Sequence, residues 1–306
     1  MSVQGQHASS TDLHTSLNAA RDVLEVVNAD HGTAYELLAA FGTGEWGAYR
    51  LAQPGGEPAV LKFFLDLQDT NVTDPDPHLA PRITDHLRPL GYPTPKYLHT
   101  GWLNDEGLYW VMEQLPGAPL WRNPTVGQVE KLVSLLRLQR DRAVSEKQNL
   151  SVFVKDVVFS GRYGKAQKLK TYSSDTRELL HQAMRSVRGL RNLSLPDEHI
   201  VHGDFSYHQA MVEDGRITGI IDWQEAGCGD WLIDLTRLLY SLHDRWELAA
   251  PVLREAERQD PRRIRLYTAY TVLEMVSWPL HRCDRAVSSG SINKARSALH
   301  FVETRL

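Results

Sequence analysis

The order of hydrophobic and polar residues divides the chain into a strand-rich beginning and a helical remainder. Up to about residue 115, short apolar runs with β-branched and aromatic residues are separated by turns that contain Gly and Pro, which is typical of strands. From residue 125 on, apart from a stretch around residues 201–223, apolar residues recur at intervals of three and four, as on one face of a helix. We therefore expect an α+β protein with a small β-rich part and a larger, mainly helical part.

The helical pattern also gives boundaries for the expected helices. Thr11 or Asp12 could cap a first helix that extends to about residue 28 and precedes the strands. Residues 1–11 before it are expected to be disordered. The other expected helices cover residues 77–90, 125–138, 174–190, 231–242, 247–259, 262–278 and 292–304.

Composition narrows the class of protein without identifying it. With 306 residues, of which 42% are hydrophobic, the chain can bury the core of two lobes. It has no apolar run near the ~20 residues that span a bilayer and no apolar signal segment at its start, so we expect a cytoplasmic protein without a membrane partner. Cys228 and Cys283 lack metal-type spacing and are expected to be free thiols. No basic stripe or aromatic RNA motif indicates a nucleic-acid partner.

The most informative segment is residues 201–209, Val-His-Gly-Asp-Phe-Ser-Tyr-His-Gln, together with Ile-Ile-Asp-Trp at residues 220–223. It supplies two carboxylates, Asp204 and Asp222, and phosphoryl transfer needs two with different tasks. One orients the acceptor hydroxyl and takes its proton, and the other holds the Mg²⁺ that bridges the nucleotide phosphates. Asp204 fits the first task and Asp222 the second.

The sequence between these two acids predicts a hairpin. Residues 210–212 and 217–221 are short apolar runs, separated by Glu-Asp-Gly-Arg with Gly in the turn. Such a hairpin returns the end of its second strand, and hence Asp222, to the loop that carries Asp204. The alternative is an ordinary hairpin with unrelated acids, which the ordered combination of His-x-Asp, hairpin and Ile-Ile-Asp-Trp disfavours.

These motifs, with Gly-Asp and Asp-Leu pairs shortly after them, resemble the aminoglycoside phosphotransferase and choline kinase superfamily, which has the bilobal fold of the protein kinases. The resemblance implies ATP and Mg²⁺ as cofactors, Asp204 as the catalytic base and Asp222 as a metal ligand. The family's second metal ligand is an Asn five residues after the base, but Gln209 occupies that position here and sets the amide oxygen one methylene further out. A nucleotide-binding pseudokinase therefore stays open as an alternative.

The resemblance extends into the strand-rich part of the chain. Gly42, Gly44 and Gly47 form a Gly-x-Gly-x-x-Gly loop, whose backbone can approach phosphates because no side chain intervenes. The next predicted strand carries Lys62 in an apolar run and resembles the kinase strand whose lysine contacts the α- and β-phosphates. The acid that pairs with this lysine in kinases is unassigned here, and Asp85 is the nearest candidate.

The apolar strand that begins at residue 108 is ended by Pro-Gly at residues 116 and 117, and it matches the family's hinge between lobes. The resemblance implies that main-chain groups of Glu113 and Leu115 bind the adenine edge. It also implies a nucleotide-binding lobe at residues 1–115 and a catalytic and acceptor-binding lobe at residues 116–306.

Two further residues acquire structural roles through the resemblance. Asp234 occupies the position of an acid that braces the catalytic loop through backbone hydrogen bonds, although a helix N-terminal acid favoured by the helix dipole is an equal alternative. His202 resembles a packed positioning residue, because an imidazole two residues before the catalytic Asp does not share its face of the pocket.

The acceptor can be predicted only as a class. The aminoglycoside branch modifies polycationic antibiotics, so acids are expected to line its acceptor pocket and attract cations. The candidates are Glu225, Asp230 and Glu274, with Trp278 as a cation-facing aromatic residue. We therefore expect an enzyme that transfers the γ-phosphoryl group of ATP to a hydroxyl of an aminoglycoside or similar cationic antibiotic and thereby confers resistance. We expect it to be a monomer or a homodimer. The alternative enzyme is a metabolic kinase for choline, homoserine or a sugar-like alcohol.

Overall fold

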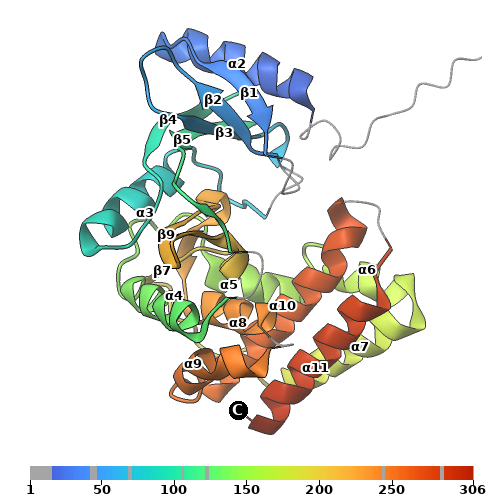
Figure 1. Ribbon diagram of the computed structural model, residues 1–306. Helices are drawn as coiled ribbons and strands as arrows, with labels where there is room; N and C mark the ends of the chain where they lie inside the picture. The colour runs from blue at the N-terminus through green and yellow to red at the C-terminus, as the bar shows by residue number, and fades with distance from the viewer. Residues whose placement is uncertain are drawn as a thin grey trace, which may run out of the picture. The chain divides into compact units, whose positions relative to one another are not determined.

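The computed structural model describes residues 16–41, 47–67, 71–104, 107–120, 124–242, 245–282 and 286–305 (Figure 1). The segment predicted to be disordered lies outside these ranges. By its internal contacts the chain forms two compact units, Met1–Pro81 with Pro95–Leu115, and Arg82–Thr94 with Pro116–Leu306. The second unit therefore includes residues 82–94, which the sequence assigned to the first.

The first unit is built on a five-stranded antiparallel sheet with the order β1-β2-β3-β5-β4 (Figure 1). Buried and less buried residues alternate along β2 and through the first part of β3, as a strand with one covered face requires. This sheet confirms the predicted strand-rich beginning. Its strands are β1 (Glu36–Ala40), β2 (Tyr49–Ala52), β3 (Ala59–Phe64), β4 (Tyr97–Trp102) and β5 (Leu108–Glu113).

Helix α2 (Leu17–His31) packs its apolar face against this sheet. The Ser16 side chain accepts a hydrogen bond from the Asn18 N–H at 3.2 Å and caps the start of the helix, and Gly32 ends it with a left-handed φ of 60°. The core between the helix and the sheet contains Ala20, Val23, Leu24, Val27, Tyr49, Leu51, Leu61 and Phe63. The first predicted helix exists, with its start at residue 17 and its end at residue 31.

The second unit is mainly helical, as predicted. Helices α6, α7, α10 and α11 lie side by side within it (Figure 1). The helices are α4 (Val126–Leu138), α5 (Leu150–Lys155), α6 (Lys165–Tyr172), α7 (Ser174–Ser186), α8 (Leu232–Ser241), α9 (Trp246–Ala256), α10 (Pro261–Arg282) and α11 (Ser289–Arg305). The sequence missed α5 and α6, because six and eight residues show too few turns to establish a period.

Helix α3 (Leu79–Leu87) crosses the boundary between the two units and continues into a 3₁₀ turn, Arg88–Leu90. It confirms the helix predicted at residues 77–90. In the described part of the chain, no helix is both long and apolar enough to cross a membrane.

Two small sheets carry the segments with the predicted chemistry. The hairpin of β8 (Ala210–Glu213) and β9 (Arg216–Ile220) pairs with β6 (Ala118–Pro119), and β7 (His199–Val201) pairs with β10 (Gly227–Gly229). Asp214 and Gly215 in the hairpin turn have φ values of 49° and 75°. An Asp-Gly pair with two positive φ values is a favoured hairpin turn, and the predicted hairpin is confirmed.

Candidate active site

The loop after β7 is held in place by the buried carboxylate of Asp234, in the first turn of α8. Its Oδ2 accepts hydrogen bonds from the His202 N–H at 2.7 Å and from Gln139 Nε2 at 2.9 Å, and its Oδ1 accepts one from the Gly203 N–H at 3.0 Å. Burial raises the pKa of Asp234 to about 6, although the three donors oppose the rise. The predicted bracing role of Asp234 is confirmed.

His202 is packed inside this loop and is fully buried. Its Nδ1 accepts a hydrogen bond from the Asp204 N–H at 3.3 Å, and its Nε2 lies 2.8 Å from the Ile221 carbonyl oxygen. These partners fix a neutral imidazole that is protonated at Nε2. The ring also contacts Trp223, with 4.6 Å between the ring centroids. The prediction that His202 is a packed positioning residue is confirmed.

Glycine is required at position 203, between the brace and the proposed base. Gly203 has a φ of 88°, and a Cβ atom added there would lie 2.9 Å from the Glu225 carbonyl oxygen. The close approach places the backbone of Glu225 beside the residue that precedes Asp204.

The hairpin returns Asp222 to the loop of residues 202–209, the proposed catalytic loop, as predicted. Ala210 pairs with Ile220, and the Ile221 N–H donates to the Gln209 carbonyl at 2.9 Å. Asp222 follows with left-handed backbone angles, φ 71° and ψ 47°, which cost a non-glycine residue on the order of 1–3 kcal/mol. Such strain is common where the direction of a side chain matters to function. The metal-binding roles of Asp222 and Gln209 remain predictions.

The carboxylate of Asp204 is held by two side chains from different elements. Its Oδ1 accepts a hydrogen bond from Arg237 Nη1 at 3.1 Å, and its Oδ2 accepts one from Gln209 Nε2 at 2.9 Å. The side chain of Asp204 is 45% exposed, whereas that of Arg237 is 6% exposed. Asp204 is therefore oriented from beneath and accessible from outside, which a group that contacts an acceptor requires.

Arg237 is the residue of this site that the sequence analysis missed. It lies in α8, where the apolar pattern predicts only core positions. Burial opposes its charge, but Asp204 and other nearby acids outweigh that effect and raise the pKa of Arg237. A sequence signal was present, because Arg237 is the single cation among the ten residues of this helix.

The structure does not support acceptor binding by Asp230. Its carboxylate is fully buried, and its Oδ2 accepts hydrogen bonds from Arg263 Nη1 at 2.9 Å and from the Tyr267 hydroxyl at 2.8 Å. Its Oδ1 accepts a third, from the Leu232 N–H at 3.2 Å. A fully buried carboxylate with three internal donors has no exposed surface for a ligand, so the geometry disfavours the predicted acceptor contact of Asp230.

Glu274 is also engaged within the protein. It lies in α10 with 2% of its side chain exposed, and it forms an ion pair with Lys165, whose side chain is 8% exposed. The Lys165 ammonium lies 5.5 Å from the centroid of the Phe153 ring. Direct contact between Glu274 and an acceptor would require this pair to open, which disfavours the predicted role. Glu225 and Trp278 are half-buried, and their acceptor roles remain predictions.

The predicted nucleotide-binding residues belong to the first unit. Lys62 lies in β3 opposite Trp110 of β5, and Gly47 has a φ of 68°. Gly42 and Gly44 lie outside the described residues. The Glu113 N–H donates to the Lys96 carbonyl at 2.9 Å, so the predicted adenine contact of Glu113 is limited to its own carbonyl. The roles of Gly47, Lys62, Glu113 and Leu115 remain predictions.

The proposed acid partner of Lys62 shows the features of a surface residue. Asp85 has 66% of its side chain exposed and lies 3.6 Å from Arg88, three residues later on the same helical segment. A pair of this kind contributes little to stability, and the acid partner of Lys62 stays unassigned.

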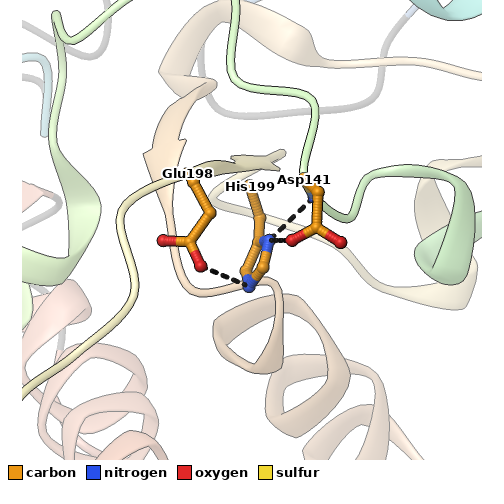
Figure 2. A group of neighbouring side chains, drawn as sticks. All are labelled: Asp141, Glu198 and His199. Carbon is orange, nitrogen blue, oxygen red and sulfur yellow. Dashed lines mark hydrogen bonds and ion pairs between the residues drawn. The ribbon is translucent and has the colours of Figure 1, made fainter.

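A second group of potential metal ligands, Asp141, Glu198 and His199, lies at the start of β7 (Figure 2). His199 Nδ1 accepts a hydrogen bond from the Asp141 N–H at 2.9 Å and lies 3.2 Å from Asp141 Oδ1, while Nε2 lies 4.0 Å from Glu198 Oε1. Nδ1 already holds the backbone of Asp141, whose φ is 55°. The imidazole therefore fixes a strained turn after α4, and we interpret the group as structural.

Comparison with known proteins identifies the family. The chain matches the family described as the phosphotransferase enzyme family over residues 39–267, which is most of its length. The chain belongs to this family. The match includes the catalytic loop, the hairpin, Asp234 and Arg237.

Individual relatives are distant. The hygromycin-B 4-O-kinase of Escherichia coli is 26% identical over 122 residues, which cover 33% of this chain and 34% of that kinase. A thermostable mutant of the aminoglycoside phosphotransferase APH(4)-Ia has a TM-score of 0.66 at 17% identity, over 90% of this chain and 98% of that one. Choline kinase LicA from Streptococcus pneumoniae has a TM-score of 0.63 at 12% identity, over 94% and 99%. These structures show that the chain shares the fold of these two kinases.

Proposed function

We propose that this protein is an ATP-dependent O-phosphotransferase that acts on a hydroxyl group of a small molecule. The observation that carries the proposal is the Asp204 carboxylate, which is 45% exposed and is oriented by Arg237 and Gln209 in a loop fixed by Asp234. Membership of the phosphotransferase family over residues 39–267 supports the reaction class.

In the proposed reaction, Asp204 accepts a hydrogen bond from the acceptor hydroxyl and takes its proton. The hydroxyl oxygen forms a bond to the γ-phosphorus of ATP, while the bond from that phosphorus to the bridging oxygen breaks and ADP leaves. The products are a phosphate monoester and ADP, with the proton on the Asp204 carboxylate until it returns to solvent. Positioning of the reactants also contributes to the rate, because phosphoryl transfer has little covalent chemistry for the protein to perform.

The donors on this loop and at the end of the hairpin are of types that suit Mg²⁺. Asp222 supplies a carboxylate and Gln209 an amide oxygen, which are ligand types that Mg²⁺ accepts. Because Gln209 Nε2 donates to Asp204, the amide oxygen at the other end of the group points away from that contact. When bound, Mg²⁺ would neutralise charge on the nucleotide phosphates. Lys62 and the main chain of Gly47, Glu113 and Leu115 are the proposed contacts for ATP.

An aminoglycoside or similar cationic antibiotic is the first acceptor to test. The family relative that phosphorylates hygromycin B supports this choice, as does a solved APH(4)-Ia structure in complex with ADP and hygromycin B, with a TM-score of 0.62. Of the three acids predicted for the acceptor, Asp230 and Glu274 pair with Arg263 and Lys165, and Glu225 is the acid that we propose for acceptor binding.

A smaller alcohol with one positive charge, such as choline, is the second candidate acceptor. Two of the three predicted acids are neutralised by Arg263 and Lys165, so fewer of the predicted acids are available to a polycation. The fold is shared with a choline kinase, which is consistent with this alternative.

The test is Mg²⁺-dependent release of ADP from ATP in the presence of hygromycin B, other aminoglycosides, choline, homoserine and sugar alcohols, with product mass to detect one added phosphoryl group. A phosphorylated aminoglycoside would support the antibiotic proposal, and a phosphorylated choline or sugar alcohol the metabolic one. Proven ATP binding with no product from any acceptor would contradict a phosphotransferase and favour the pseudokinase. The variant Asp204→Asn is the control for background hydrolysis.

A further inference from the structure

We propose that Arg237 is a positioning residue for phosphoryl transfer, which holds the Asp204 carboxylate in the orientation that receives the acceptor hydroxyl. The inference rests on the proposed function. It begins from the contact between Arg237 Nη1 and Asp204 Oδ1 at 3.1 Å, which joins α8 to the catalytic loop.

The place of Arg237 in α8 is costly unless it serves a purpose. Leu235, Leu238 and Leu239 lie around it on the helix and are buried. Only 6% of the Arg237 side chain is exposed. Removing a guanidinium from water is unfavourable, and an apolar side chain of similar volume often serves stability equally well. Stability alone therefore does not explain an arginine at this position, whereas a fixed partner for an exposed carboxylate does.

Arg237 is itself held in place by α10. The guanidinium carbon lies 6.0 Å from the centroid of the Tyr270 ring, and Nη1 lies 3.5 Å from Met275 Sδ. Its planar fork loses little freedom when it binds, because the packing has already fixed it. A buried and immobilised donor can define the position of Asp204 more narrowly than a surface donor could.

The two oxygens of Asp204 are fixed from different directions. Arg237 holds Oδ1 and Gln209 holds Oδ2, so rotation of the carboxylate would break one contact or both. A displacement of about 1 Å at a reacting group can reduce the rate on the order of 100-fold. Loss of Arg237 should therefore reduce turnover even if the protein binds both substrates normally.

The experiment compares Arg237→Gln and Arg237→Lys with a matched control, Arg263→Gln, which breaks the second buried Asp–Arg pair. We expect Arg237→Gln to lower kcat roughly 10- to 100-fold, with KM for ATP changed by less than about threefold. Arg237→Lys retains the charge and should recover part of the loss. Arg263→Gln should lower the thermal midpoint and leave kcat per folded molecule nearly unchanged.

A double-mutant cycle then separates positioning from other roles. In the Asp204→Asn background, Arg237→Gln should cost less than about threefold in kcat, because the group that it positions is already absent. An equal loss in both backgrounds would overturn the proposal. An increase in the acceptor KM with unchanged kcat would also overturn it, because it would show direct binding of the acceptor by Arg237.

A stability cycle on the same four proteins distinguishes failure of this inference from failure of the proposed function. If Arg237 and Asp204 pair in solution, the sum of the decreases in thermal midpoint of the two single variants should be larger than the decrease in the double variant. Additive shifts would show that the pair does not exist in solution and would overturn the inference. Non-additive shifts without phosphorylation of any acceptor would leave the pair supported and place the failure in the proposed function.

Discussion

The second unit contains two Asp–Arg ion pairs that differ in which partner is more exposed. In the first, Arg237 is 6% exposed and its partner Asp204 is 45% exposed, at an N–O distance of 3.1 Å. In the second, Arg263 is 21% exposed and its partner Asp230 is fully buried, at 2.9 Å. The two pairs have similar N–O distances, but they differ in the exposure of the acid.

The difference in exposure indicates which of the two acids can contact a substrate. Asp230 accepts hydrogen bonds from Arg263, Tyr267 and the start of α8, so its carboxylate is used within the fold. Asp204 is bound from beneath by Arg237 and Gln209, and nearly half of its surface faces outward. We expect substitutions of Asp230 to reduce stability and substitutions of Asp204 to reduce turnover.

The largest expected effect is that of Asp204→Asn on turnover. The amide keeps the size of the side chain but cannot take a proton from the acceptor, so kcat should fall on the order of 10²–10⁴-fold. Steady-state kinetics with an identified acceptor would measure the fall, with nucleotide binding measured separately to show an intact ATP site. Unchanged turnover would remove Asp204 as the base.

Asp230→Ala is expected to have the opposite profile. Removal of one partner from a buried pair leaves Tyr267 and Arg263 without their acceptor, and it should lower the free energy of unfolding by about 3–5 kcal/mol. Denaturant unfolding would measure the loss, and kcat would be normalised to the folded fraction. Normal stability with a large loss of kcat would break the comparison between the two pairs.

Asp234 should add a pH dependence to stability. Burial raises its pKa to about 6 in the folded protein from an ordinary 3.8, so the folded state binds this proton more tightly than the unfolded state does. Its contribution to the free energy of unfolding should therefore fall as pH rises from about 4 to 6, by up to about 3 kcal/mol, and stay constant above that range.

The measurement is the difference in unfolding free energy between the wild-type protein and Asp234→Asn from pH 4 to pH 8. The variant cannot titrate at this position, so the difference isolates the contribution of Asp234 from that of other acids. A difference that does not vary with pH would show that the three donors keep Asp234 ionised across the range.

The smallest expected effect is that of Gln209→Asn. The shorter amide should lose its hydrogen bond to Asp204 Oδ2, which is worth about 0.5–1.5 kcal/mol, or roughly a two- to tenfold fall in kcat. Kinetics over a Mg²⁺ titration would measure it. A rise in activity would instead show that Gln209 is a poor substitute for the family's Asn and that its contact with Asp204 is not needed.

The sequence was sufficient for most of the fold. Short apolar runs between turns predicted a strand-rich beginning, and helical periods predicted α4 and α7 to α11, because the helical pattern repeats over enough residues to be distinguished. It failed at α5 and α6, which are short. It also assigned residues 82–94 to the first unit, since affiliation depends on contacts that a linear pattern does not contain.

By itself, the sequence determined the order of His-x-Asp, hairpin and Ile-Ile-Asp-Trp, and hence that Asp204 and Asp222 would be brought together by local pairing. Only the tertiary structure decided how each acid is used, because burial and ion pairing depend on helices far away in the chain. Arg263 and Lys165 neutralise Asp230 and Glu274, which the sequence had predicted as acceptor-binding acids. Arg237, which the sequence presented as one residue of an apolar helix, meets Asp204 because α8 packs beneath the catalytic loop.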